Sequence, residues 1–308
     1  MLPIFDGHCD VLFRLDDDSN LSFNKENGLH SSAPLLRKGG AKVQCFALYI
    51  GESIPEESKY SNVLHMVDTF FNQVIEPNQD MVLVRTKQEI DELQDHQIGA
   101  MLTLEGCDAI GHDLIKLRTL YRLGVRSVGL TWNHANSCAD GALEPRGGGL
   151  TRFGFEVVRE NNSHKVMTDV SHLSERSFWD VIEAAKYPIA SHSNVKRLCD
   201  HPRNLTDEQI TALFTNDGFI GVTFVPKFLT TQAKASISDI LRHIEYLCEL
   251  GGVSHIGFGS DFDGIDETPK DMKNYGDYPK LVGALLKRYS EEQVKGFLFK
   301  NFYDCLPG

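Results

Sequence analysis

Histidine and acidic side chains stand at the ends of several short apolar segments of this chain. His8 and Asp10 follow PIFDG, Glu105 closes MLTLE, His172 closes VMTDVSH and His192 closes PIASH. Imidazole and carboxylate groups together are the ligands that zinc and similar divalent ions select. Taken singly, each of these residues is explained as well or better by a structural role, so the signal is that all of them share one position in their segments.

Asp261 adds a further ligand-type residue at the end of IGFGSD, which makes six in all. Six are too many for one tetrahedral ion, but they suit two ions about 3.5–4 Å apart that share a carboxylate and a hydroxide. Such a pair lowers the pKa of the shared water and polarises a carbonyl group. The residue types therefore predict a binuclear metal-dependent hydrolase.

The segments that carry these residues have the length and near-continuous hydrophobicity of strands that are covered on both faces. Eight strands are expected, at residues 3–8, 42–50, 98–105, 125–132, 165–171, 187–192, 219–225 and 255–261. Helical patterns lie between them, with capping boxes predicted at Thr86, Thr206 and Ser290, a start at Ser174 and a stop at Gly251. This alternation predicts an α/β fold, a (β/α)₈ TIM-like barrel of the metal-dependent hydrolase type, with an open doubly wound sheet as the alternative.

The length of 308 residues gives a weak prior of two domains, but a barrel of about 250 residues folds as one unit. Because no linker and no internal repeat is visible, we expect a single catalytic barrel domain over residues 1–308. Long loops are expected after the first, fourth, seventh and eighth strands, at residues 9–41, 133–149, 226–235 and 262–277. All four follow the carboxyl end of a strand, where barrels of this kind build their sites.

The composition narrows the class of protein. Hydrophobic residues make up 41% and charged residues 24% of the chain, which is ordinary for a globular protein. The net charge of −12 argues against a nucleic-acid partner or an anionic membrane surface. The seven cysteines form no CxxC and are odd in number, and neither a signal peptide nor a long apolar run is visible. We therefore expect a cytoplasmic protein with reduced thiols that does not enter a membrane.

Five motifs in this order, DGHCD, LEG, DVSH, SHS and GSDFDG, resemble those of the membrane (renal) dipeptidase family, which are zinc dipeptidases built on a (β/α)₈ barrel. The resemblance spans nearly the whole chain. It implies a metallo-dipeptidase with two Zn²⁺ ions per chain and a small-molecule dipeptide as substrate. It also implies that a hydroxide bridging the two ions attacks the peptide bond.

The resemblance also implies a role for each candidate residue. His8 and Asp10 would bind one zinc ion, Glu105 would bridge both ions, and His172 with His192 would bind the second. Asp261 would be the catalytic proton donor and acceptor beside the substrate.

Two more residues receive a role from the resemblance alone. His134, in the segment LTWNH, corresponds to the family histidine that contacts the reacting carbonyl, although the match is looser there. Arg203, which precedes Asn204, corresponds to the arginine that receives the substrate carboxylate. Catalysis would thus involve Asp261, His134 and Glu105, and substrate binding would involve Arg203, His134 and Asp261.

Two other functions are compatible with the same residues. A related binuclear amidohydrolase could act on a cyclic amide or another C–N bond, but such enzymes usually begin with H-x-H and bridge their metals with a carbamylated lysine. A non-catalytic metal-dependent binding protein would need no proton donor at Asp261. The sequence leaves open which dipeptide side chains and stereochemistry are preferred, whether β-lactams or dehydropeptides are cleaved, and whether the chain forms a homodimer.

Overall fold

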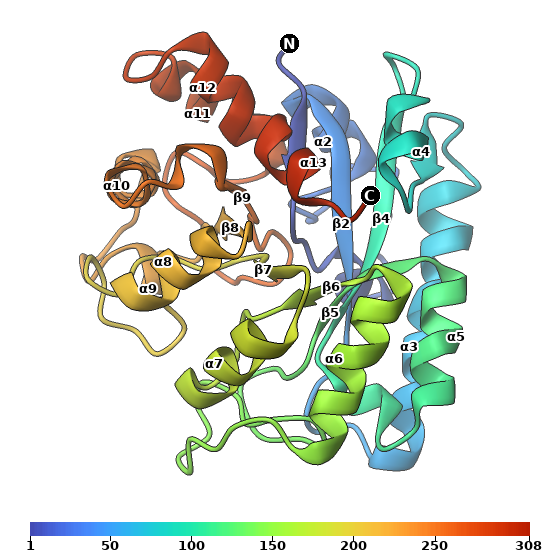
Figure 1. Ribbon diagram of the computed structural model, residues 1–308. Helices are drawn as coiled ribbons and strands as arrows, with labels where there is room; N and C mark the ends of the chain where they lie inside the picture. The colour runs from blue at the N-terminus through green and yellow to red at the C-terminus, as the bar shows by residue number, and fades with distance from the viewer.

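The computed structural model describes residues 1–308, and a closed ring of eight parallel strands forms its centre (Figure 1). The ring closes because β2 pairs with β4 as well as with β1, in register from Val43↔Gly99 to Tyr49↔Glu105. The predicted barrel is confirmed and the open doubly wound alternative is wrong. The ring strands are β1 (Ile4–Asp6), β2 (Ala41–Tyr49), β4 (Ile98–Glu105), β5 (Val125–Gly129), β6 (Met167–Asp169), β7 (Pro188–Ala190), β8 (Phe219–Val222) and β9 (Ile256–Phe258).

A ninth strand, β3 (Met81–Leu83), lies outside the ring and pairs with the first residues of β4. This strand was not predicted, because three residues are too few to show a hydrophobic period. It lengthens the sheet beside β4 and takes no part in closing the barrel.

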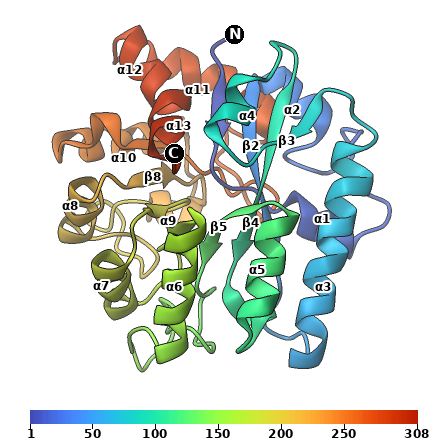
Figure 2. The ribbon, with the colours of Figure 1, turned by 45° about the vertical axis from the view of Figure 1, so that its right-hand side comes forward.

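Helices surround the ring, as the two ribbon views show (Figures 1 and 2). None of them is both long and apolar enough to span a lipid bilayer. They are α1 (Val11–Asp17), α2 (Ala33–Gly39), α3 (Glu56–Thr69), α4 (Lys87–Asp91), α5 (Leu114–Leu123), α6 (Arg152–His164), α7 (Glu175–Ala184), α8 (Asp207–Thr215), α9 (Pro226–Leu229), α10 (Ile237–Glu249), α11 (Tyr278–Leu285), α12 (Glu291–Lys295) and α13 (Asn301–Cys305).

The predicted helix starts are confirmed. A hydroxyl oxygen accepts a hydrogen bond from the backbone N–H three residues on at each of Thr86, Ser174, Thr206 and Ser290. The boxes of α8 and α12 are reciprocal, as expected. At α4 the prediction of a full box is wrong, because the Glu89 carboxylate accepts from the backbone N–H of Arg85 at 2.5 Å instead of that of Thr86. At the other end of a helix, Gly251 takes the left-handed conformation (φ 95°) just after α10.

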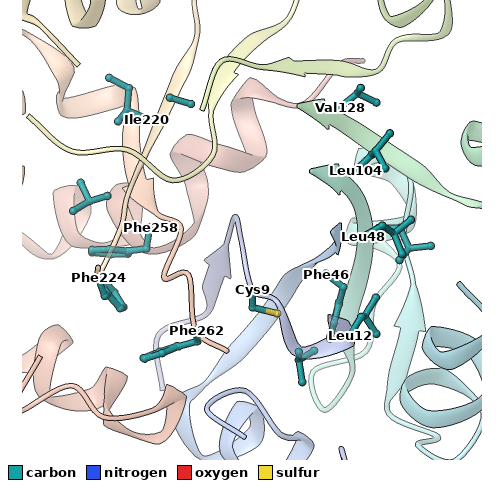
Figure 3. Close-up of a cluster of buried hydrophobic side chains, with 14 of the residues drawn as sticks. Cys9, Leu12, Phe46, Leu48, Leu104, Val128, Ile220, Phe224, Phe258 and Phe262 are labelled. Carbon is teal, nitrogen blue, oxygen red and sulfur yellow. The ribbon is translucent and has the colours of Figure 1, made fainter. Parts of the chain in front are cut away.

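The side chains of the ring strands alternate between two hydrophobic clusters. Phe46 of β2 and Leu104 of β4 belong to the larger cluster, of 68 residues, which packs the strands against the helices (Figure 3). Cys45 of β2 and Met101 of β4 belong to a separate cluster of 12 residues. Because strand side chains alternate with a period of two, Glu105 projects to the same side as Met101, into the barrel.

The amino-terminal end of the barrel is filled by aromatic side chains. The ring of Phe302, from α13, stacks on Phe219 at a centroid distance of 4.3 Å and an interplanar angle of 8°. Phe302 also lies 4.3 Å from the ring of Phe5, on β1. This packing leaves the carboxyl-terminal end as the place for a polar site.

Seven of the eight ring strands end earlier than the sequence predicted. After β1, β6, β7 and β9 the candidate ligands therefore lie in the first residues of the loops. His172 (φ 69°) and Asp261 (φ 63°) adopt the left-handed conformation, which cannot continue a strand. His8 and Asp10 come together because the chain turns into α1, whose N-cap is Asp10. The two residues therefore meet through this turn and not by sharing one side of a strand, since β1 ends at Asp6.

Candidate metal centre and active site

Glu105 stands at the centre of a buried group of imidazole and carboxylate side chains. Its Oε1 lies 2.9 Å from His172 Nε2 and 3.6 Å from His192 Nε2, and its Oε2 lies 3.5 Å from His8 Nε2. His8 Nε2 in turn lies 3.3 Å from Asp10 Oδ2. The five predicted ligands thus come from four separate segments to one place, with Glu105 touching three of them.

Asp261 joins this group on the side of His8. Ligand atoms of His8, Asp10 and Asp261 all lie within 4.8 Å of one another, and so do those of His8, Glu105 and His192. His8 is shared by both sets, and its Nε2 is buried and makes no hydrogen bond. A buried ring nitrogen without a partner, surrounded by carboxylates, fits a metal ion as its missing partner.

The charges of the cluster also fit cations. Burial raises the pKa of Asp10 and of Asp261, and Glu105 adds a repulsive charge that raises both further. Burial lowers the pKa of His8, but Asp10 and Glu105 outweigh it, so that pKa lies well above its usual value. Three carboxylates packed together in this way need positive charge among them.

The second half of the cluster consists of neutral imidazoles. The Nε2 atoms of His172 and His192 lie 2.8 Å apart, and both rings are buried. Burial, and then the charge of Arg203, lower the pKa of His172 to about 3. Neutral histidine is the form that binds a metal, so these two residues with Glu105 are suited to a second ion.

Buried hydrogen bonds hold the backbone that presents these residues. Asp6, at the end of β1, accepts from the backbone N–H of His8 at 3.2 Å and from that of Ser260 at 2.9 Å. Asp169, at the end of β6, accepts from the backbone N–H and the hydroxyl of Ser191, whose oxygen also lies 2.8 Å from His192 Nδ1. Each aspartate thus ties the end of its own strand to the next strand of the ring.

Arg203 lies beside this cluster with much of its guanidinium group unpaired. The residue is 4% exposed, yet its Nε and Nη2 atoms have no hydrogen-bond partner. It shares a cavity of about 40 Å³ with His172 and Ser193, and its guanidinium carbon lies 5.5 Å from the centre of the Phe228 ring. A buried guanidinium with free donors is well suited to an incoming carboxylate.

His134 is the one predicted site residue that the structure does not bring into the buried group. Its side chain is 50% exposed, and its Nδ1 lies 2.8 Å from both carboxylate oxygens of Glu52. The two residues follow the carboxyl ends of β5 and β2, which places the pair on the rim of the barrel. Glu52 was not among the residues predicted from the sequence to form the site.

The residues that support the candidate ligands were also not predicted from the sequence. Asp6, Asp169 and Ser191 lie inside the motifs DGHCD, DVSH and SHS, but no role was assigned to them. Asn133 was noted only as a neighbour of His134, although its Oδ1 lies 2.9 Å from His172 Nδ1. A polar residue one or two positions from a candidate ligand was the available signal.

The barrel and its cluster of histidine and carboxylate groups define a metal-dependent hydrolase, and three similar proteins narrow this class. A metallopeptidase from Rhodobacter sphaeroides, solved with a phosphinate mimic of the dipeptide L-Ala-D-Ala, is 27% identical with a TM-score of 0.92, and the match covers 99% of this chain and 98% of that one. The solved M19 metallopeptidase dipeptidase AC is 29% identical with the same TM-score and the same coverage. An uncharacterized dipeptidase of Schizosaccharomyces pombe is 32% identical over an alignment of 301 positions, which covers 91% of this chain and 72% of that protein.

The family model of the membrane dipeptidases, peptidase family M19, matches residues 1–306. The chain therefore belongs to this family of metallopeptidases and is a dipeptidase with a metal cofactor. The resemblance seen in the sequence motifs is confirmed.

Proposed function

We propose that this protein hydrolyses dipeptides with two zinc ions held by His8, Asp10, Glu105, His172 and His192. The observation that supports this most strongly is that the two oxygens of Glu105 face different imidazoles, Oε2 that of His8 and Oε1 that of His172. A carboxylate with that arrangement is suited to touch two ions at once. When bound, the ions would supply an activated water as nucleophile and would polarise the scissile carbonyl.

Arg203 would bind the C-terminal carboxylate of the dipeptide. Its free Nε and Nη2 donors match the two oxygens of a carboxylate, and its burial excludes competing water. The contact would place the peptide bond next to Glu105 and Asp261, since the charge of Arg203 lowers the pKa of both His172 and Asp261.

Asp261 would move the proton during the reaction. Burial raises the pKa of this carboxyl group, which favours a group able to hold a proton and then to give it to the leaving amine. His134 would contact the reacting carbonyl from the rim, with its ring oriented by Glu52. Because the His134 side chain is half exposed on the rim, it would make this contact only once a substrate lies in the barrel mouth.

The proposal is tested by metal analysis together with a dipeptide library. Purified protein is expected to hold two equivalents of zinc and to cleave dipeptides, with L or D stereochemistry at the second residue compared directly. Glu105→Gln should lose metal and activity together, because it removes one charge and one shared oxygen. Less than one equivalent of zinc, with no activity on adding it, would contradict the proposal; turnover of dihydroorotate-like rings but not of dipeptides would favour the cyclic-amide alternative.

We also propose that the chain acts as one catalytic domain in the cytoplasm. The cluster of 68 core residues runs from Ile4 to Leu298, and all seven cysteines are free thiols, as in reducing compartments. A single cooperative unfolding transition would support the first point. Sedimentation analysis of the purified chain would decide whether it forms a homodimer.

A further inference from the structure

Asn133 makes contact with the edge of the His172 ring that faces away from the metal cluster. Its side-chain oxygen Oδ1 lies 2.9 Å from His172 Nδ1. The other ring nitrogen, Nε2, faces Glu105 Oε1 at 2.9 Å and His192 Nε2 at 2.8 Å. Asn133 therefore forms a hydrogen bond with Nδ1 of His172, the ring nitrogen that would not bind a metal ion at this site.

The chemistry of the pair selects one tautomer of His172. An amide oxygen only accepts, so the Nδ1 atom must carry the hydrogen, and the lone pair is left on Nε2. The opposite arrangement, with the amide nitrogen donating to Nδ1, would put a hydrogen on Nε2, where it would block a metal ion. The contact with Asn133 thus prepares His172 as a ligand.

The loop that carries Asn133 also holds the backbone of His172. The carbonyl oxygen of Asn133 accepts from the N–H of Leu143 at 2.8 Å, and that of His172 accepts from the N–H of Ala142 at 2.7 Å. Gly141 allows this close packing, because a β-carbon there would lie 2.5 Å from the carbonyl carbon and oxygen of Asn133. One loop therefore holds the backbone of both Asn133 and His172, which keeps the two side chains within reach of each other.

We infer that Asn133 is a positioning residue, which orients the His172 ring and fixes its tautomer for the metal ion that His172 and His192 share. His192 has an analogous partner, since the Ser191 hydroxyl lies 2.8 Å from its Nδ1 and donates to Asp169. The role of Asn133 rests on the proposed metal function. It adds to that function a residue outside the ligand set, on a loop between β5 and α6.

The experiment measures zinc affinity by competition with a chromogenic chelator, beside the thermal unfolding of the metal-free protein. Asn133→Ala is expected to lower the affinity for one of the two zinc ions by about 10–100-fold, as loss of such a hydrogen-bond partner of a ligand typically does. The other ion should bind as in the unmodified protein. Asn133→Asp keeps an oxygen acceptor at the same place, so it should restore the affinity.

Asn162→Ala provides a matched control. Asn162 also makes side-chain hydrogen bonds, to the carbonyl oxygen of Ala184 and from the N–H of Lys186, but it lies on α6 away from the cluster. Its substitution should lower the unfolding temperature of the metal-free protein and leave both zinc affinities unchanged. Asn133→Ala should show the reverse pattern, with a metal-free unfolding temperature close to that of the unmodified protein.

Several results would overturn the role. Unchanged affinities in Asn133→Ala would do so while leaving the proposed function intact, and so would equal weakening by Asn133→Asp. Loss of both ions, with a large fall in the metal-free unfolding temperature, would show that Asn133 supports the fold in general and not one histidine. If the unmodified protein bound no zinc, the proposed function and this role would fall together.

Discussion

Gly264 lies directly against the carboxylate of Asp10. A β-carbon at position 264 would overlap Asp10 Oδ2 and would lie 2.6 Å from Asp261 Oδ1. Only a residue without a side chain leaves these two carboxylates where the structure has them. Gly264 therefore belongs to the site although it carries no chemical group of its own.

Gly264→Ala is expected to displace Asp10 and Asp261 and to lower kcat/KM by about 10²-fold, since a shift of about 1 Å in a site has effects of that size. Gly283→Ala serves as the control, because Gly283 lies inside α11 with no atom within 4 Å of the added carbon. There alanine should stabilise the fold by about 0.8–1 kcal/mol. Steady-state kinetics and urea unfolding of both variants check this; full activity in Gly264→Ala would contradict it.

Arg203→Met should separate substrate binding from stability. Loss of a buried charged hydrogen-bonding partner costs about 2–5 kcal/mol in binding, so kcat/KM for dipeptides should fall by about 10²–10³-fold. For the corresponding dipeptide amides, which lack the carboxylate, the fall should be small. The unfolding temperature should not drop, because the guanidinium is buried with unpaired donors and burial lowers its pKa to about 10. Equal losses for dipeptides and amides would argue against carboxylate binding by Arg203.

Asp261→Asn should leave the shape of the site intact and remove its proton carrier. Asparagine tolerates the left-handed conformation of this position (φ 63°) as well as aspartate does. We expect kcat to fall by about 10²–10⁴-fold, with KM and zinc content little changed. Metal analysis alongside the kinetics is decisive, since loss of zinc would make Asp261 a ligand instead.

His243, which is not one of the candidate metal ligands, is expected to make the stability of the fold depend on pH. Its Nδ1 accepts from the N–H of Val195 at 3.1 Å and its Nε2 donates to the carbonyl oxygen of Leu229 at 3.0 Å, which requires the neutral ring. Burial lowers its pKa from 6.5 to about 4. Between these two values the unfolded chain binds a proton that the folded chain does not, so stability is lost as the pH falls.

The expected loss from this group is about 1.4 kcal/mol per pH unit between pH 6.5 and 4. His243→Gln keeps a polar group but does not titrate, so its stability should depend less steeply on pH over that range. Urea unfolding at several pH values, with metal removed from both proteins, measures the two slopes. Equal slopes would show that His243 is protonated in the folded protein as readily as in the unfolded one.

The sequence by itself indicated the ring strands, several helix starts and the candidate ligands. Continuous apolar segments fixed the eight ring strands, and hydroxyl groups at Thr86, Thr206 and Ser290 fixed three helix starts, because both signals depend on near neighbours in the chain. Glu105 could be assigned to the interior from the strand period alone, since β4 extends to that residue.

Tertiary structure decided what depends on contacts between distant segments. The pairing of β2 with β4 closed the ring, and β3 was added outside it. The strands β6 and β9 end early, and His172 and Asp261, which follow them, adopt the left-handed conformation that turns the chain. The tertiary structure also left the Nε and Nη2 atoms of Arg203 buried without hydrogen-bond partners and placed His134 on the rim beside Glu52. The direction of a side chain is set by the local backbone angles and by what packs around it, and residue types along a chain specify neither.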